Sequence, residues 1–151
     1  MKQEIIDTQA MIAFGARIGA QCVGGEVIEL VGDIGAGKTT FTKGLAAAMG
    51  IDDDIQSPTF TISRVYDAND GKILAHYDFY RLDDAGIMSA ELAESVHDDH
   101  TVTVIEWGSI ITDILPADRL TIEITPQDKE MRVVTMTADG EKSRRVMKGV
   151  V

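Results

Sequence analysis

The sequence reads Gly32-Asp33-Ile34-Gly35-Ala36-Gly37-Lys38-Thr39, and this stretch decides the fold. It matches the phosphate-binding loop pattern G-x-x-x-x-G-K-[ST] at every fixed position. A β-branched run typical of a strand precedes it at 26–31, and a helical pattern follows at 40–49, with Gly50 placed to end that helix. A strand, a glycine-rich loop and a helix in this order predict the nucleotide-binding unit of an α/β protein.

The residue types in this loop suit the phosphates of a nucleotide. Glycines let the main chain approach a phosphate closely, with its N–H groups at the positive end of the following helix. The Lys38 ammonium is placed to act on the β and γ phosphates, and the Thr39 hydroxyl is placed to bind Mg²⁺. The expected nucleotide contacts are Gly35, Ala36, Gly37, Lys38, Thr39 and Thr40.

The bulk composition is that of an ordinary globular domain. Because 25 acidic side chains face 14 basic ones, for a formal net charge of −11, broad direct contact with nucleic acid is not expected. Cys22 is the single cysteine, so no internal disulfide can form and a reducing, cytoplasmic location is expected. No apolar run reaches the ~18 residues of a membrane span. We expect one domain over 1–151, whose basic end, 142–151, is a solvated and flexible tail or, alternatively, a contact for an acidic partner.

Outside the loop, the sequence alternates between helix-like and strand-like segments. The helical patterns cover 84–96, a shorter piece at 110–115, and 8–22, which Asp7 or Thr8 can cap. The strand-like patterns, of which the first two predict a hairpin, cover 59–66, 72–78, 101–105, 120–125 and 131–138. We therefore predict an α/β fold of three layers, similar to phosphate-loop NTPases, in which helices flank a mixed sheet.

Two acidic residues that follow apolar strands complete the expected site. A phosphate-loop enzyme needs a carboxylate at the end of a neighbouring strand, and ligands of open α/β sheets gather at the carboxyl ends of the strands. Glu106 ends the most β-like run, so it is the first candidate to hold Mg²⁺ together with Thr39, directly or through a water. Asp78 is the candidate for positioning or activating the attacking water. The alternative for each is an exposed strand-end carboxylate that bonds to a loop.

Other side chains allow less definite predictions. Trp107, the sole tryptophan, is included among the candidate nucleotide contacts, although a position covering the sheet edge fits equally well. Arg64 and Arg81 could offer charge to the γ-phosphate, and the spacing prefers neither. Three histidines lack metal-ligand spacing with cysteine and are expected to be ordinary polar residues: His76, His97 and His100.

Five blocks of sequence carry a resemblance to a known family. They are 32–41, Ser57-Pro58-Thr59-Phe60, Asp78-Phe79-Tyr80-Arg81-Leu82, Glu106-Trp107 and Leu115-Pro116. In order and spacing they resemble the bacterial TsaE (YjeE) family, small ATPases required for the threonylcarbamoyladenosine modification of tRNA. The resemblance covers about residues 8–138. This chain departs from it at Phe79, where the family usually has Leu, and after Trp107, where many members have Pro or Ala.

The resemblance implies a phosphate-loop α/β fold that binds ATP and Mg²⁺. It implies that Thr39 and Glu106 hold the metal and that Asp78 is important for hydrolysis. It also implies that the segments around Thr8 and Lys129 lie near the nucleotide.

The partners that the resemblance implies are TsaD and TsaB. This pair transfers the threonylcarbamoyl group to adenosine 37 of tRNAs that read codons beginning with A. The acidic net charge fits an ATPase that reaches tRNA only through these partners, and that hydrolyses ATP slowly when alone.

Two alternatives stay open at this stage. A small-molecule kinase is one, since several are phosphate-loop proteins of similar size, although no Arg-rich lid segment is evident. A nucleotide-gated binding module, for which the bound state alone matters, is the other. A GTPase is disfavoured because the sequence has no Asn-Lys-x-Asp guanine-reading motif.

Overall fold

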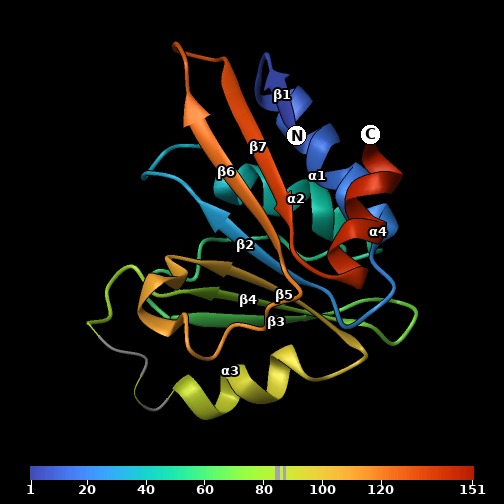
Figure 1. The fold of residues 1–151 in the computed structure, drawn as a ribbon, viewed down its shortest axis with the longest axis vertical. Coiled ribbons are helices and arrows are strands. Elements are labelled where there is room, and N and C mark those ends of the chain that lie inside the picture. The colour runs from blue at the N-terminus through green and yellow to red at the C-terminus, as the bar shows by residue number, and fades with distance from the viewer. Residues whose placement is uncertain (84–85, 87) are drawn as a thin grey trace.

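The computed structural model describes residues 1–83, 86 and 88–151. The chain folds around a seven-stranded mixed sheet with strand order β1-β7-β6-β2-β5-β4-β3, and helices cover both faces (Figure 1). In its centre, β2 (Val27–Val31), β5 (Thr101–Glu106) and β4 (Ile73–Asp78) run parallel, and β6 (Leu120–Pro126) runs parallel to β2. The predicted α/β class, with a mixed sheet flanked by helices, is confirmed.

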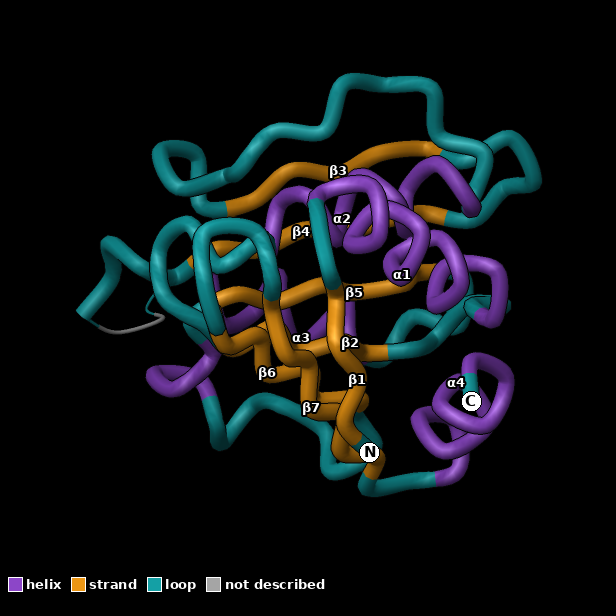
Figure 2. The backbone as a smooth tube through the Cα atoms, turned by 90° about the horizontal axis from the view of Figure 1, so that it is seen from above, coloured by secondary structure: helices purple, strands orange, loops and turns teal. Residues whose placement is uncertain are grey.

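The two faces of the sheet carry two separate cores. On one face, α1 (Thr8–Gln21) and α2 (Lys38–Ala48) pack side by side (Figure 2). On the other face, α3 (Met88–Val96) packs against β5. Because side chains alternate along a strand, β4 sends Leu74 into the first core and Tyr77 into the second. The molecule therefore has the three predicted layers.

Helices α1 and α2 approach each other unusually closely, and two glycines permit it. A Cβ on Gly15 would overlap the carbonyl oxygen of Phe41, and a Cβ on Gly44 would overlap that of Ile12. The contact fixes α2 against α1, and with it the phosphate loop at the start of α2. Of the two residues predicted to cap α1, Asp7 does so, since its carboxylate accepts the Ala10 N–H at 2.7 Å.

The predicted hairpin is confirmed, but its first strand is shorter than expected. Strand β3 (Ser63–Asp67) pairs antiparallel with β4 and begins at Ser63, not at residue 59. The preceding residues turn back instead, with Ile62 at a positive φ of 70°. This turn lies beside the end of β4, because the Asp78 N–H donates to the Ile62 carbonyl at 2.8 Å.

The other predicted segments are found with adjusted bounds. Strands β5, β6 and β7 (Arg132–Ala138) confirm the patterns at 101–105, 120–125 and 131–138. The helix predicted at 84–96 is α3 from Met88, while residues 84, 85 and 87 of its predicted start lie outside the described residues. The helical piece predicted at 110–115 is wrong in its bounds, since a short 3₁₀ helix, η1, covers Gly108–Ile111.

Both ends of the chain carry elements that the sequence patterns missed. Strand β1 (Lys2–Ile5) pairs antiparallel with β7 at the sheet edge. The segment predicted as a solvated, flexible tail at 142–151 is not a tail but forms α4 (Glu141–Val150) beside α1, with its four basic side chains exposed (Figure 2). Its buried side chains recur at helical spacing: Ser143, Val146 and Val150. Among the described residues, the helices are too short or too polar to cross a bilayer.

Candidate nucleotide and metal site

The phosphate loop ends in a helix terminus built to receive an anion. Gly37 is the N-cap of α2 at φ 114°, and no side chain among the described residues caps this helix. The first amides of α2, on Lys38, Thr39 and Thr40, therefore have neither an intrahelical partner nor a capping side chain. A glycine is required at position 37 by the positive φ, and a Cβ there would also lie 3.3 Å from Met11 of α1. These features fit a phosphate group.

A cavity of about 450 Å³ opens over this terminus. Most residues predicted for the site line it: Gly35, Gly37, Lys38, Thr39, Thr40, Asp78, Glu106 and Trp107. The other three predicted contacts lie outside the described lining. Ala36 is buried beneath the loop, Thr8 is exposed in the first turn of α1, and Lys129 is exposed between β6 and β7. Their contact with a nucleotide stays a prediction.

The two predicted acids lie next to each other at the ends of β4 and β5. Asp78 and Glu106 are register partners in the parallel pair and are 3% and 2% exposed. The alternative of exposed strand-end carboxylates is therefore wrong. Alternation along the strands explains why both side chains point to the α2 face, as Leu74 and Val104 do. The sheet thus delivers two buried carboxylates to the phosphate loop.

Asp78 is held by hydroxyl groups of the Ser-Pro-Thr turn. The Thr59 hydroxyl donates to its Oδ2 at 2.7 Å, and the Ser57 hydroxyl donates to the same oxygen at 3.4 Å. The Tyr80 N–H donates to Oδ1 at 2.9 Å. Sequence reasoning used Ser57 and Thr59 only as marks of a family, whereas here they fix the orientation of a site carboxylate. Their turn also explains why β3 begins late.

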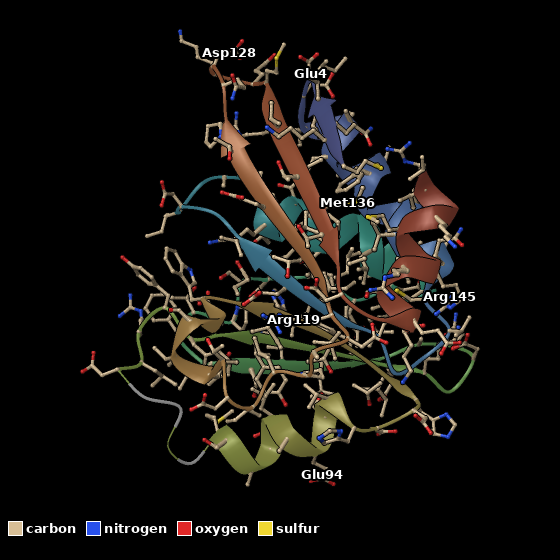
Figure 3. All side chains as sticks on the ribbon, in the orientation of Figure 1. Glu4, Glu94, Arg119, Asp128, Met136 and Arg145 are labelled. Carbon is tan, nitrogen blue, oxygen red and sulfur yellow. The ribbon has the colours of Figure 1, made fainter. Side chains whose placement is uncertain are left out.

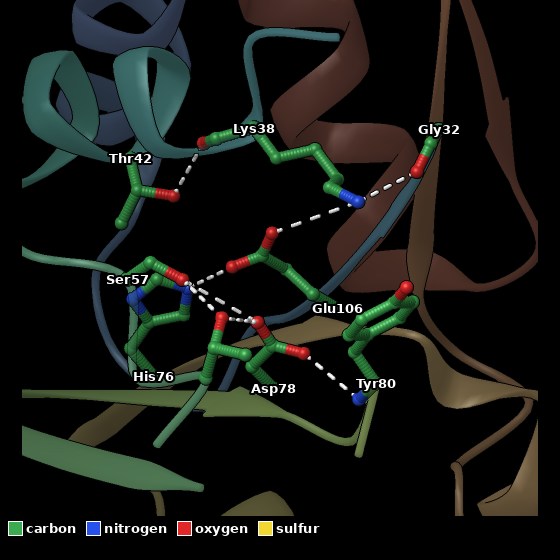
Figure 4. A network of polar contacts seen from close by, with 9 residues as sticks. Gly32, Lys38, Thr42, Ser57, His76, Asp78, Tyr80 and Glu106 are labelled. Carbon is green, nitrogen blue, oxygen red and sulfur yellow. Dashed lines mark hydrogen bonds and ion pairs between the residues drawn. The ribbon is translucent and has the colours of Figure 1, made fainter. Parts of the chain in front are cut away.

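Glu106 lies between a histidine and the loop lysine (Figure 4). Its Oε2 is 2.7 Å from His76 Nε2, and its Oε1 is 3.9 Å from Lys38 Nζ. The prediction that His76 is an ordinary polar residue is wrong, because it is completely buried and contacts Glu106. The signal was in the sequence, since His76 lies two residues before Asp78 on a strand and so shares its face.

Besides its ion pair with Glu106, Lys38 is held inside the site by two contacts. Its amine donates to the Gly32 carbonyl at 2.6 Å and lies 4.3 Å from the centre of the Trp107 ring. Trp107 in turn packs on Tyr80 with 4.9 Å between ring centres, so it covers the cavity and not the sheet edge. Burial lowers the pKa of Lys38, although the nearby carboxylates of Glu106, Asp78 and Asp33 favour its charged form.

Two arginines lie at the site: Arg81, which the sequence suggested, and Arg132, which it did not. Arg81 lines the cavity, and its guanidinium lies 4.3 Å from the centre of the Phe60 ring. Arg64 is exposed on β3 and is not part of the described lining. Arg132, which sequence reasoning missed, donates to the Ala36 carbonyl at 3.1 Å. It ties the loop to the β6–β7 hairpin, whose tip carries Asp128 (Figure 3).

The oxygen donors of the cavity fit Mg²⁺ shared with a phosphate. Mg²⁺ is usually bound by one or two carboxylates together with substrate phosphates, and not by an all-protein cage. Thr39 and Glu106 line the same cavity as the anion-binding terminus and supply oxygens of this kind. Within the described part of the chain, no three His, Cys, Asp or Glu side chains gather to form a complete metal site.

A model of the family described as threonylcarbamoyl adenosine biosynthesis protein TsaE matches residues 5–134. The chain belongs to the TsaE family. A relative named tRNA threonylcarbamoyladenosine biosynthesis protein TsaE, from Bacillus subtilis, is 44% identical over 119 residues, which are 78% of this chain and 73% of the relative. The Streptomyces coelicolor protein of the same name is 36% identical over 137 residues, which are 87% of this chain and 93% of that one.

The fold comparison agrees with the TsaE assignment. The crystal structure of YdiB from Bacillus subtilis superposes with a TM-score of 0.83 at 34% identity, covering 99% of this chain and 93% of YdiB. The family resemblance predicted from five sequence blocks is confirmed. Because the fold likeness extends over nearly the whole chain, it also covers the C-terminal segment that the sequence blocks left unmatched.

Proposed function

We propose that this TsaE-family protein is a Mg²⁺-dependent ATPase of the cytoplasm. It supports the TsaD–TsaB complex in transferring the threonylcarbamoyl group to adenosine 37 of tRNAs that read codons beginning with A. The observation that carries the proposal is the pairing of Asp78 with Glu106, both buried and facing Lys38 and the free amides of α2 in one cavity. An anion cradle beside two buried carboxylates suits phosphoryl chemistry that needs a metal.

Each side chain has a distinct task in this proposal. The amides of the first turn of α2 and the Lys38 ammonium bind the phosphates. Mg²⁺, held by Thr39 and Glu106, would neutralise charge on the phosphate oxygens. Asp78 orients the attacking water, because Ser57, Thr59 and Tyr80 fix its carboxylate while leaving acceptor capacity on Oδ1.

The open rim of the cavity supports the partner dependence of the reaction. Two apolar side chains, Ile34 and Phe60, border the cavity while largely exposed, and Tyr80 borders it half-exposed; Phe60 is exposed by 81%. Water enters freely past such a rim, and catalysis by electrostatic preorganisation gains from excluding water. A partner that covers the rim would raise the rate. The net charge of −11 suits docking to the proteins that hold tRNA better than direct docking to tRNA.

The deciding experiment is Asp78→Asn, which keeps the shape of the side chain and removes its charge. We expect the release of free phosphate from Mg·ATP to fall about 100-fold or more, since loss of a charged group in the transition state costs about that much. Nucleotide affinity, followed by the fluorescence of Trp107, should stay within about threefold because Asp78 acts on the water. Asp67→Asn is the matched control, an exposed aspartate that ends β3, and should behave as wild type.

The outcome also separates the alternatives. A rate retained in Asp78→Asn would contradict the hydrolytic role of this residue. If tRNA modification by the TsaD–TsaB pair survives in a variant that binds but does not hydrolyse ATP, the bound state is the useful one. A phosphorylated acceptor in place of free phosphate would favour a kinase.

A further inference from the structure

The geometry points to His76 as a positioning residue that fixes the orientation of the Glu106 carboxylate, so that one oxygen faces the nucleotide cavity. The inference rests on the proposed function and adds a residue that acts through Glu106 without touching the nucleotide. His76 lies on β4 opposite Val104 of β5, so Glu106, two residues further along, is its diagonal neighbour on the same face. The two side chains meet beneath the cavity with His76 fully buried.

The hydrogen bonding of His76 is one-sided. Its Nε2 is 2.7 Å from Glu106 Oε2, whereas its buried Nδ1 has no partner among the described residues. A carboxylate only accepts, so the geometry assigns a proton to Nε2, which donates to Glu106. A core position with no further task would be filled more favourably by an apolar side chain. The bond to Glu106 is therefore what the imidazole contributes here.

That bond keeps two opposite charges apart. Glu106 Oε2 is occupied by His76, and Oε1 is 3.9 Å from Lys38 Nζ, beyond hydrogen-bond distance. Lys38 donates instead to the Gly32 carbonyl at 2.6 Å. In a buried site, an unrestrained carboxylate would close onto the ammonium to form a charge-assisted hydrogen bond. Oε1 would then no longer be available to bind Mg²⁺, and the Lys38 amine would no longer be available to bind phosphate.

Three substitutions test this geometry because they differ in where, or whether, they place a hydrogen-bond donor. In His76→Gln the side-chain NH₂ reaches the place of Nε2, whereas in His76→Asn it reaches only the place of Nδ1. His76→Leu supplies no donor. We expect the apparent Mg²⁺ affinity of the ADP complex to fall roughly 10- to 100-fold in the Asn and Leu variants, as is typical when the partner of a metal ligand is removed. The Gln variant should stay within about threefold of wild type, because its donor is in place.

The readout is binding and not turnover. Mg²⁺ is titrated into protein with ADP while the fluorescence of Trp107, which lines the cavity, is recorded, and ADP binding in EDTA serves as the reference. The loss should be larger with Mg²⁺ than in EDTA. Thr103→Val is the matched control, since Thr103 is equally buried on β5 but bonds to Ser95 instead of Glu106. It should leave Mg²⁺ affinity unchanged.

Every outcome decides the matter. Equal Mg²⁺ affinities in wild type and all three variants would overturn the role of His76 and leave the proposed function intact. Absence of Mg²⁺-dependent nucleotide binding in wild type would overturn both. If the Asn and Leu variants fail to fold, nitrogen NMR of wild type replaces them. A proton is expected on Nε2 of His76, and an Nε2 that carries no proton would overturn the inference.

Discussion

Glu26 and Glu106 are both buried glutamates, yet they lie at opposite ends of the parallel strands and are used differently. Glu26 precedes β2, and its carboxylate accepts the N–H groups of Val23 and Gly24 at 2.9 and 2.8 Å and a guanidinium N–H of Arg145 on α4. Both of its oxygens are thereby occupied. Glu106 ends β5, accepts one hydrogen bond from His76, and turns its other oxygen toward the cavity.

The difference teaches how to separate a structural acid from a candidate functional one. Burial alone does not separate them, because Glu26 and Glu106 are 3% and 2% exposed. What separates them is whether the protein itself satisfies the carboxylate. A satisfied carboxylate holds elements together, here the turn before β2 and helix α4. A buried carboxylate such as Glu106, with one oxygen free beside a cation and a cavity, destabilises the folded protein. Such a group is a candidate for binding a ligand.

The largest effect is expected for Glu106→Gln. It removes the charge at the cavity while keeping the shape, so hydrolysis of Mg·ATP should fall about 100-fold or more, which corresponds to about 2.7 kcal/mol. The free energy of unfolding without nucleotide should be unchanged or slightly higher, because an incompletely paired buried charge is removed. Phosphate release and urea unfolding measure the two quantities. A rate within about threefold of wild type would break the distinction between the two glutamates.

Glu26→Gln, the same substitution at the opposite end of the parallel strands, should lower stability and leave the rate unchanged. Glu26→Gln turns an acceptor into a donor facing the Gly24 N–H or Arg145, so we expect stability to fall by about 2 kcal/mol. The melting temperature should fall by about 4–8 °C for a chain of this size. The rate of the protein that remains folded should equal that of wild type. If Glu26→Gln lowered the rate without lowering stability, Glu26 would have to be counted with the functional acids.

These contrasts also show what the sequence could and could not predict. The phosphate loop, Asp78 and Glu106 were found because each is a local pattern at the end of a strand. The contacts of Thr59 and His76 were not, because they join residues 19 and 30 positions apart in the chain and depend on the strand register. Sequence patterns do not specify which strands become neighbours.

The two ends of the chain were missed for different reasons. Strand β1 has only four residues at the sheet edge, too few for an alternating pattern to stand out. Helix α4 does carry a pattern, with buried positions at 143, 146 and 150, but its many charged side chains suggested a solvated segment. Its apolar stripe gains meaning only once α1 lies beside it.

The smallest expected effect concerns Asp118, which, like Glu26, accepts hydrogen bonds from the protein on both carboxylate oxygens. It caps α4 from outside the helix, because the N–H groups of Lys142 and Ser143 donate to its two oxygens at 2.9 and 3.0 Å. Gly140, the N-cap residue, has no side chain to do this. Asp118→Ala should therefore cost about 1 kcal/mol of stability, as the loss of a helix cap usually does. If the proposed function holds, phosphate release from Mg·ATP should be unaffected, since neither Asp118 nor any residue of α4 is among the described cavity-lining residues.

The stabilisation that Asp118 gives to α4 should depend on pH, and this dependence tests whether its carboxylate acts as a charged helix cap. Partial burial raises the pKa of Asp118, but the hydrogen bonds from Ser143 and Lys142 outweigh it, and the net pKa is lowered. A lowered pKa means that the stabilisation is complete above the ordinary value of about 3.9 and is lost as the pH falls through the folded-state value. Unfolding curves of wild type and Asp118→Ala should therefore differ at neutral pH and converge in acid. Asp139→Ala, at an exposed aspartate between β7 and α4, should match wild type at every pH. A constant gap for Asp118→Ala would show that its effect is not that of a charged cap.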